Sequence, residues 1–224
     1  MIIAVEGADK AGKHTQVMKI VEYLNGRDIA TETLDFPQYQ SRYAMEIKNY
    51  LNGNTNINRE KLMELFALDR RAKMPIVKQW LDMGKWVVFD RYTYSNIYSI
   101  AKLPREQWVP EIEKLEDMEF NQMGIIRPDH NIYLYLPAQI SYEMRNQGLK
   151  AYQNGKPDIN ESDLNLLIGV ADVYKTLVAR DPKNWTVVNE IKSDGTRMNP
   201  NEVFATLRPI IGKMILQHRN RQTK

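Results

Sequence analysis

The chain starts with a short apolar run, Ile2–Val5, that leads at once into a loop containing two glycines and a lysine. Gly7 and the pair Gly12-Lys13 have the spacing of a phosphate-binding loop, and apolar residues at helical spacing follow over His14–Leu24. Glycines allow backbone N–H groups to converge on an anion, and a helix N-terminus adds a partial positive charge. A chance turn with two glycines and a lysine is the simpler alternative. The position between a strand and a helix favours a phosphate site in which Lys13 reaches the β and γ phosphates.

The residue after this lysine departs from the usual loop. A serine or threonine hydroxyl normally helps to hold a magnesium ion there, whereas this chain has His14. Thr15 lies one step, about 100°, further round the helix, so it cannot simply take over that role. We still expect a magnesium–nucleotide at this loop, with the coordination of the metal open. One hypothesis is that neutral His14 forms a hydrogen bond with a metal-bound water or a phosphate.

Apolar runs and helical patterns alternate along the chain. Five runs are typical of strands, namely Ile2–Val5, Ile29–Asp35, Trp86–Phe89, Ile132–Leu136 and Trp185–Val188. The alternation predicts an α/β fold, in which a five-stranded parallel sheet is flanked by helices with right-handed crossovers. Ligands of such sheets bind beyond the carboxyl ends of the strands, so residues there are the first candidates for a site.

Three helical patterns also bear on the site. A long helix is expected over Arg59–Met83, with Pro75 kinking it or dividing it in two. Helical structure is expected over Arg105–Met123, and a further helix is expected to begin at Ser141.

Composition narrows the possible functions. The 224 residues include no cysteine, which excludes a disulfide-stapled scaffold, a cysteine-ligated zinc site and a cysteine nucleophile. The net charge of +3 is too small to argue for nucleic-acid binding, and no apolar run approaches the roughly 20 residues of a membrane span. We therefore expect neither nucleic acid nor a membrane as partner. The length exceeds a typical domain of about 100–150 residues but is short for two, which predicts one domain over residues 1–224.

Three further segments follow strand ends or lie on the long helix. They are Asp35-Phe36-Pro37-Gln38-Tyr39, Leu65-Phe66-Ala67-Leu68-Asp69-Arg70-Arg71 and Phe89-Asp90-Arg91-Tyr92-Thr93-Tyr94-Ser95-Asn96. Together with the phosphate loop, in this order and spacing, they resemble the thymidylate kinase family. Arg127-Pro128-Asp129 and the stretch Lys156–Glu161 add to this resemblance, which covers residues 1–190.

The resemblance implies a P-loop nucleotide kinase fold with a lid segment over residues 141–160. It also implies transfer of the γ-phosphate of ATP to dTMP, giving dTDP and ADP. The implied cofactor is Mg²⁺ with ATP, the implied ligands are ATP and dTMP, and the implied assembly is a homodimer in the cytoplasm.

The resemblance further implies catalytic roles for Asp9, Lys10, Lys13 and Arg91. Asp9 resembles the carboxylate that contacts the sugar 3′-hydroxyl, and Lys10 resembles a loop cation that neutralises charge on the transferring phosphoryl group. The guanidinium of Arg91 suits bidentate binding of the acceptor phosphate. Asp90, at the end of a buried strand beside the loop, is the expected magnesium-organising carboxylate. A helix-terminal acid for Asp9 and a structural ion pair for Arg91 are the simpler alternatives.

Two sets of binding residues follow from the resemblance. The expected ATP-binding residues are Gly7, Ala11, Gly12, Lys13, His14, Thr15, Arg145 and Asn189. The expected dTMP-binding residues are Asp9, Phe36, Pro37, Tyr39, Phe66, Arg70, Arg91, Ser95, Asn96, Ser99 and Tyr152.

Two positions depart from the family pattern. The family often carries an arginine where this chain has Gln38, and an aromatic residue where it has Ser99, with Tyr98 beside it. The first departure shifts binding of the acceptor phosphate toward Arg91. The second leaves the sugar side of the pocket open and makes an altered pyrimidine substrate an alternative.

Three functions therefore stand beside one another. They are a dTMP kinase, a kinase for another or a modified pyrimidine deoxynucleoside monophosphate, and a non-catalytic nucleotide-binding protein. A non-catalytic protein would be expected to lack Asp9, Lys13 or Arg91, and all three are present; His14 alone favours reduced activity. A GTPase switch would need an Asn-Lys-x-Asp motif, which the chain lacks. An adenylate kinase would carry Gly-x-Pro-Gly, whereas this loop has Ala8-Asp9.

Overall fold

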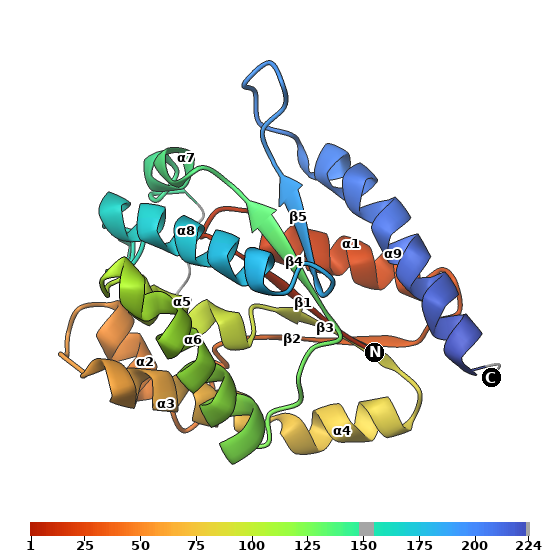
Figure 1. The fold of residues 1–224 in the computed structure, drawn as a ribbon, viewed down its shortest axis with the longest axis horizontal. Helices are drawn as coiled ribbons and strands as arrows, with labels where there is room; N and C mark the ends of the chain where they lie inside the picture. The colour runs from red at the N-terminus through yellow and green to blue at the C-terminus, as the bar shows by residue number, and fades with distance from the viewer. Residues whose placement is uncertain (148–154, 223–224) are drawn as a thin grey trace.

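A computed structural model describes residues 1–147 and 155–222 of the chain. Five parallel strands form one sheet in the order β2-β3-β1-β4-β5, as the sequence predicts (Figure 1). The strands are β1 (Ile2–Gly7), β2 (Thr31–Asp35), β3 (Trp86–Asp90), β4 (His130–Tyr135) and β5 (Trp185–Asn189). Because all strands run the same way, their carboxyl ends meet at one edge of the sheet.

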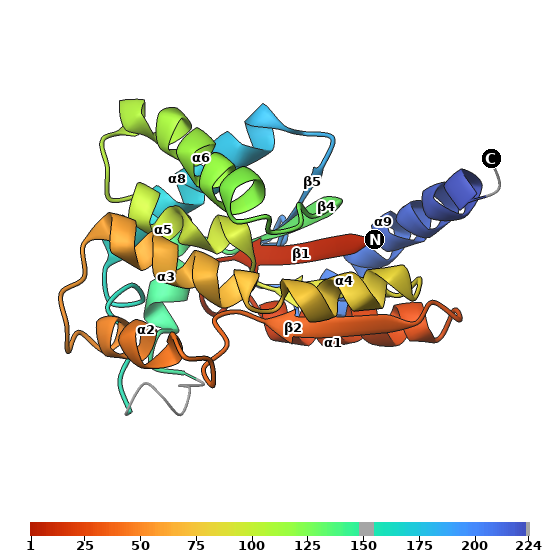
Figure 2. The same ribbon diagram turned by 90° about the horizontal axis from the view of Figure 1, so that it is seen from below.

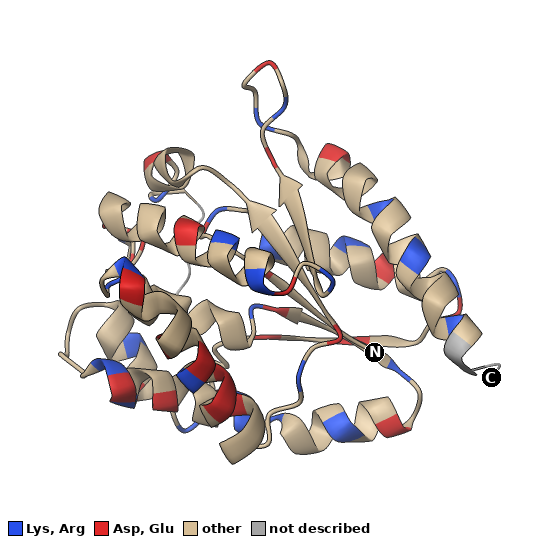
Figure 3. Ribbon diagram, in the orientation of Figure 1, with Lys and Arg blue, Asp and Glu red and all other residues tan. Residues whose placement is uncertain are grey.

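Two helices, α1 (Lys13–Asn25) and α9 (Pro200–Gln222), cover one face of the sheet (Figures 1 and 2). Alternation along β1 directs Ile3 and Val5 to this face, where they pack with apolar residues of both helices. Lys and Arg residues occur on helices of both layers of the molecule (Figure 3). Among the described residues, no helix combines the length and apolarity that crossing a membrane requires.

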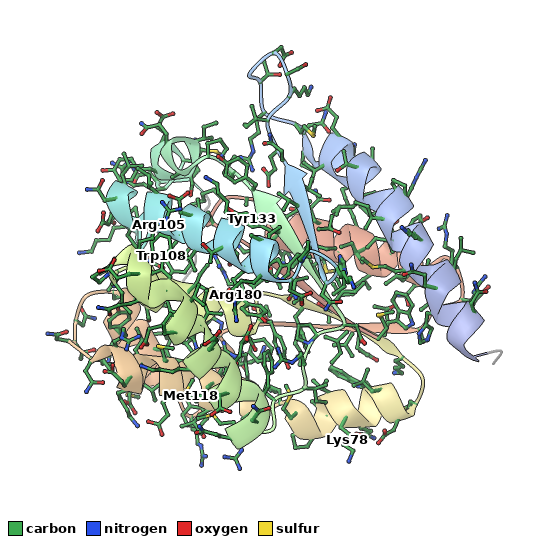
Figure 4. All side chains as sticks on the ribbon, in the orientation of Figure 1. Lys78, Arg105, Trp108, Met118, Tyr133 and Arg180 are labelled. Atoms are coloured by element: carbon green, nitrogen blue, oxygen red, sulfur yellow. The ribbon has the colours of Figure 1, made fainter. Side chains whose placement is uncertain are left out.

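The opposite face is covered by a larger set of helices. They are α3 (Arg59–Arg71), α4 (Met74–Asp82), α5 (Ile97–Ile100), α6 (Trp108–Glu116) and α8 (Leu164–Arg180). Ile2 and Ala4 of β1 face this layer. At the end of α8, Arg180 reaches α6 and pairs with Glu113 at 3.4 Å and Glu116 at 3.7 Å (Figure 4). Two shorter helices, α2 (Ala44–Leu51), which packs on α3, and α7 (Ala138–Glu143), which packs on α8, complete the layer around the site.

The structure decides between two predicted alternatives and changes two other helix boundaries. The helix expected over Arg59–Met83 is divided into α3 and α4, one of the two alternatives, and Pro75 occupies the first turn of α4, where its missing N–H is not needed. The expected helix over Arg105–Met123 consists of a 3-10 turn, α6 and a π-helical segment over Asp117–Gln122. The helix expected from Ser141 begins three residues earlier, directly after Pro137.

One close approach at the carboxyl edge explains a glycine. Gly7 ends β1 with φ 148°, and a Cβ atom there would lie 2.6 Å from the carbonyl oxygen of Leu134 on β4. A side chain cannot fit at that distance, so glycine lets β1 and β4 stay paired up to the point where the phosphate loop begins. Asp35 and Asp90 are register partners at the ends of β2 and β3, which places them on the same edge.

Candidate active site

The phosphate loop runs from Gly7 to Gly12, and α1 begins directly after it. Gly12 has φ 63°, a left-handed conformation that glycine adopts readily. Lys10 also has a positive φ of 67°, which is uncommon for a residue with a side chain and recurs at functional sites. Lys13 is 7% exposed, and its ammonium group donates a hydrogen bond to the carbonyl oxygen of Ala8 at 2.7 Å, across the loop.

Two cavities meet at the carboxyl edge of the sheet. The donor cleft is lined by Asp9, Lys10, Gly12, Lys13, His14, Thr15, Asp35, Phe36, Tyr39, Asp90, Arg91 and Glu161. The acceptor cavity is lined by Asp9, Phe36, Pro37, Tyr39, Tyr50, Leu51, Leu62, Phe66, Arg70, Arg91, Ser95, Asn96, Tyr98, Ser99, Lys102, Asp158 and Asn160. Asp9 and Arg91 line both, so this pair stands at the junction of the two.

Arg91 and Asp9 form an ion pair at the junction. Arg91 follows β3 with φ 66°, and its Nη1 donates to the carbonyl oxygen of Gly7 at 3.2 Å. Burial acts to lower the pKa of Arg91, but Asp9, Tyr98, Tyr174 and Asp90 together outweigh it, so the pKa lies well above its usual value. The guanidinium therefore remains a cation inside the site. This ion pair is compatible with both roles considered for Arg91, phosphate binding and a structural ion pair, because a bound phosphate can share the guanidinium with Asp9.

Glu6 is a fully buried carboxylate that the sequence analysis did not assign. It accepts hydrogen bonds from the backbone N–H of Tyr92 at 2.9 Å, from Ser95 Oγ at 2.6 Å and from Tyr174 Oη at 3.0 Å. Burial raises the pKa of Glu6, and the hydrogen bond from Ser95 and the charge of Arg91 act against that rise. Glu6 thus connects the segment after β3 to β1 through hydrogen bonds. The sequence signal that could have identified this role is a carboxylate within the otherwise apolar run of β1.

The far end of the acceptor cavity is built around Glu119. Arg70 on α3 donates from Nε to Glu119 at 2.8 Å and also pairs with it through Nη2. Asn96 donates to Glu119 at 2.9 Å and Thr93 donates at 2.8 Å. Glu119 lies on the π-helical segment and is 0% exposed, and Phe66 lines the cavity one helical turn before Arg70. No pattern in the sequence marked Glu119.

The sugar side of the acceptor cavity is polar. Tyr98 Oη donates to Asp9 at 3.3 Å, and Ser99 lines the cavity beside it. Lys102, one turn further on, donates from Nζ to Tyr50 Oη at 3.1 Å. Hydroxyl and ammonium groups therefore line this side of the cavity around Ser99.

Two acidic residues from the end of the expected lid segment reach the site. Asp158 is 6% exposed and accepts hydrogen bonds from the backbone N–H groups of Asn160 at 2.9 Å and Glu161 at 3.0 Å. Burial, followed by repulsion from Asp9 and Glu161, raises the pKa of Asp158 to about 7. Glu161 pairs with Lys10 of the phosphate loop at 3.3 Å. The two carboxylates connect this segment to both cavities.

Asp90 and His14 are the candidates for interaction with a metal ion. His14 Nδ1 lies 3.5 Å from Asp90 Oδ2, and the imidazole is 77% exposed on the donor-cleft side. Among the described residues, no group of three or more acidic, histidine or cysteine side chains could hold a metal by itself. Mg²⁺ commonly uses one or two carboxylates together with water and substrate phosphates. The carboxylates of Asp90 and Asp35 therefore fit Mg²⁺ that arrives with a nucleotide, and His14 is near enough to contact a water on it.

The structure separates some predicted residues from the two cavities. Every predicted acceptor residue within the described part of the chain lines the acceptor cavity, while Tyr152 lies outside the described residues. Arg145 is turned toward Tyr142, with its guanidinium 3.9 Å from that ring and Nη1 donating to that residue's carbonyl oxygen at 2.8 Å. Asn189 accepts a hydrogen bond from the backbone N–H of Ile191 at 3.0 Å. Neither of these two residues lines the donor cleft, and neither do Gly7 and Ala11, so their assignment to ATP stays a prediction.

Comparisons with known proteins agree with the geometry. The family model for thymidylate kinase matches residues 5–196. The thymidylate kinase of Mycobacterium tuberculosis is 30% identical over 216 residues, covering 93% of this chain and 98% of that protein. The Arabidopsis thaliana thymidylate kinase is 28% identical over 84% of this chain and 64% of its own length. A solved structure of thymidylate kinase from Candida albicans has the same fold, with a TM-score of 0.74, 20% identity, and coverage of 95% of this chain and 91% of that one. The chain belongs to the thymidylate kinase family, whose members are ATP-dependent kinases that phosphorylate dTMP.

Proposed function

We propose that this chain transfers the γ-phosphate of ATP to the 5′-phosphate of dTMP where its two cavities meet. The observation that carries the proposal is that Asp9 and Arg91 line both cavities. One cavity begins at a phosphate loop, and the other ends at an aromatic ring, Phe66, and a buried arginine, Arg70. A donor phosphate and an acceptor phosphate bound in these cavities would therefore meet beside Arg91.

The donor side supplies cations and backbone N–H groups. Lys13 and the N-terminus of α1 bind the β and γ phosphates, and Lys10 stabilises the charge on the transferring group. Asp90, with Asp35 beside it, would hold Mg²⁺ through oxygen ligands, and the ion would supply further neutralisation of the phosphate charges.

The acceptor side orients the attacking oxygen. The second pKa of a phosphate monoester is about 6, so an oxygen of dTMP is already ionised at neutral pH and attacks without a protein base. The bond from that oxygen to the γ-phosphorus forms, and the bond to the oxygen bridging the β and γ phosphorus atoms breaks, leaving ADP. Arg91 holds the attacking phosphate in line, while Asp9 holds Arg91 and accepts a hydrogen bond from the sugar 3′-hydroxyl.

The base end selects a pyrimidine. Phe66 offers an aromatic face for stacking, and Ser95 and Asn96 provide polar groups near Arg70. Arg70 Nη1 donates to the carbonyl oxygen of Tyr92 at 3.4 Å, which is long for a hydrogen bond. This nitrogen can therefore also donate to a carbonyl oxygen of the base. The network around Glu119 fixes the direction of that donor.

A panel of acceptors tests the proposal. We would measure ADP release from ATP with dTMP, dUMP, dCMP, dGMP and AMP at equal concentrations. We expect dTMP to give the highest kcat/KM. The specific proposal is lost if dTMP releases no more ADP than dCMP, dGMP or AMP.

A second acceptor class is favoured by the polar sugar side. Ser99, Lys102 and Tyr50 place hydroxyl and ammonium groups where a larger or more polar pyrimidine nucleotide could bind. Adding dTMP derivatives with polar substituents on the sugar to the panel decides between the two classes. A higher kcat/KM for such a derivative than for dTMP identifies a kinase for modified pyrimidine nucleotides.

We also propose a homodimer in the cytoplasm, on the basis of the family alone. Sedimentation velocity of the purified chain measures the assembly directly. A sedimentation coefficient that corresponds to a 26.2 kDa particle at all concentrations contradicts the dimer.

A further inference from the structure

A tight turn projects beyond the sheet between β5 and α9 (Figure 1). Its two arms pair through an antiparallel bridge between Ile191 and Arg197, and Lys192 donates from its backbone N–H to the carbonyl oxygen of Thr196 at 2.9 Å. At the tip, Asp194 accepts hydrogen bonds from the backbone N–H of Thr196 at 2.9 Å and from its hydroxyl at 2.6 Å. The turn is therefore held by its own hydrogen bonds. The family resemblance assigned no role to it.

Arg197, at the base of this turn, joins three distant segments. Its Nη2 donates to the carbonyl oxygen of Lys10 in the phosphate loop at 2.6 Å. Nη2 and Nε also donate to Glu190, at 2.7 and 3.0 Å, just after β5. Its Nη1 lies 3.0 Å from the sulfur of Met144 at the end of α7. One guanidinium thus connects the turn to the residue that carries a proposed catalytic cation.

Glu190 fixes the direction of this guanidinium. It is 2% exposed, and two donors of Arg197 converge on the same carboxylate oxygen. Burial raises the pKa of Glu190, and the charges of Arg197 and Lys13 act against that rise. A charge-assisted pair held in this way has little freedom to rotate, so the third bond, to Lys10, is held in a set direction as well.

The phosphate loop needs such support at this position. Lys10 has φ 67°, a left-handed conformation that is unfavourable for a residue with a side chain. The preceding carbonyl group, that of Asp9, accepts a hydrogen bond from Ser141 Oγ at 2.7 Å. Two consecutive carbonyl groups of the loop are therefore held from outside, by α7 and by the turn, while the side chains of Asp9 and Lys10 face the cavities.

We propose that Arg197 is a positioning residue for phosphoryl transfer, which acts by holding the backbone of Lys10 so that Lys10 and Asp9 point at the transfer site. Glu190 in turn holds Arg197. This inference rests on the proposed function for its kinetic consequence. The contact between the turn and the loop does not depend on which acceptor the enzyme uses.

The chain offers a matched control in the same turn. Lys192 carries the same charge, is partly exposed, and pairs with Glu202 of α9 at 2.6 Å rather than with the phosphate loop. Lys192→Ala removes a cation from the turn without touching the loop. Arg197→Ala removes the cation that holds the phosphate loop. Arg197→Lys keeps the charge but loses the forked geometry of the guanidinium.

The experiment measures the loop and the reaction separately. Hydrogen–deuterium exchange over residues 7–14 reports the loop in the full chain without substrates, and steady-state kinetics gives kcat, KM for ATP and KM for dTMP. We expect Arg197→Ala to speed exchange in this peptide and to lower kcat by about 10- to 100-fold, the cost of a small misplacement of reacting groups. KM for dTMP should stay close to that of the parent. Added guanidinium ion should restore part of kcat in Arg197→Ala, and Lys192→Ala should match the parent throughout.

Two results overturn the proposal. The first is exchange over residues 7–14 that is as slow in Arg197→Ala as in the parent, whether or not the enzyme is active. The second is faster exchange over the whole chain, which would show a general loss of stability. If the parent is inactive with every monophosphate, the proposed function fails, while the exchange comparison still decides the role of Arg197.

Discussion

The base end of the acceptor cavity and the phosphate loop are built in different ways. At the base end, Arg70 and Asn96 bind Glu119, and the exposed fractions of these side chains lie between 0% and 3%. Removing charged groups from water is costly unless they are paired and hydrogen-bonded, and this network satisfies that requirement before any substrate binds. The groups proposed to contact the base are therefore already in place.

The cations of the phosphate loop are held by partners that a nucleotide can replace. Lys10 pairs with Glu161 at 3.3 Å, and Lys13 donates to a carbonyl oxygen of its own loop. Phosphate oxygens are stronger partners for a lysine than a carbonyl group is. Under the proposed function, acceptor selectivity is built into the packed core, whereas donor binding exchanges protein contacts for phosphate contacts.

The largest expected effect is at the junction, which belongs to both regions. Arg91→Ala removes the guanidinium that contacts Asp9 and is proposed to bind the acceptor phosphate, and we expect kcat to fall by about two to three orders of magnitude. Steady-state ADP release measures it. Arg71→Ala, at the exposed end of α3, is the control that removes an arginine outside the site. Near-normal turnover in Arg91→Ala would contradict the role given to the junction.

The next effect tests the claim that the base end is fixed in advance. Glu119→Gln leaves the Arg70 cation buried without its counter-charge, which typically lowers the free energy of unfolding by about 3 kcal/mol or more. Urea denaturation measures that loss, and KM for dTMP should rise because Arg70 is no longer held. Glu113→Gln, which removes an exposed partner of Arg180, should change neither quantity noticeably. Equal denaturation midpoints for Glu119→Gln and the parent would refute the network's importance.

A smaller effect is expected at the open donor side. His14→Ser restores the hydroxyl that a phosphate-binding loop usually offers to magnesium. We expect the Mg²⁺ concentration for half-maximal rate to fall by about a few fold, because hydroxyl oxygen suits this ion better than imidazole nitrogen does. Thr15→Ser, at the neighbouring position, serves as control. Unchanged turnover together with an unchanged Mg²⁺ dependence would show that His14 does not act on the metal or the phosphates.

The smallest effect concerns Asp158, the buried carboxylate that lines the acceptor cavity. The pKa of Asp158 is raised from 3.8 to about 7, so between these values the folded chain binds a proton that the unfolded chain releases. Its contribution to stability is therefore complete below about pH 4 and is lost as pH rises through 7. Asp158→Asn removes this contribution.

Thermal melting at several pH values tests that sign. The melting temperature of the parent should fall between pH 5 and pH 8 by about a few degrees more than that of Asp158→Asn. Asp82→Asn, at the exposed end of α4, should follow the parent. Identical pH profiles for the parent and Asp158→Asn would show that this carboxyl group titrates normally.

The sheet and the outline of the site could be predicted from the sequence. Apolar runs such as Trp86–Phe89 become buried parallel strands, and the residues that follow them meet at one edge for a topological reason. That is why Asp9, Phe36 and Arg91, from three separate segments, line the same cavity. Helix ends were less accurate, since Pro75 allows either a kink or a division, and tertiary packing decides between them.

The supporting residues could not be predicted because their partners are remote in sequence. Glu119 binds Arg70 across 49 residues, and Arg197 binds Lys10 across 187 residues. Neither pairing leaves a periodic pattern, and the π-helical segment that carries Glu119 has no recognised signal. Local patterns identified the residues that face the cavities, whereas the residues behind them depend on how separate segments pack.

The place of β1 in the sheet has a consequence for how activity is lost on heating. β1 has a hydrogen-bonded neighbour on each side, β3 and β4, whereas β2 and β5 are the outermost strands. Partial unfolding starts where structure is least protected. Fraying of β2 leaves both β1 and the contact from Arg197 to Lys10 intact, whereas fraying of β5 releases that contact. Nucleotide binding should therefore persist through melting that begins at β2 and weaken in melting that begins at β5.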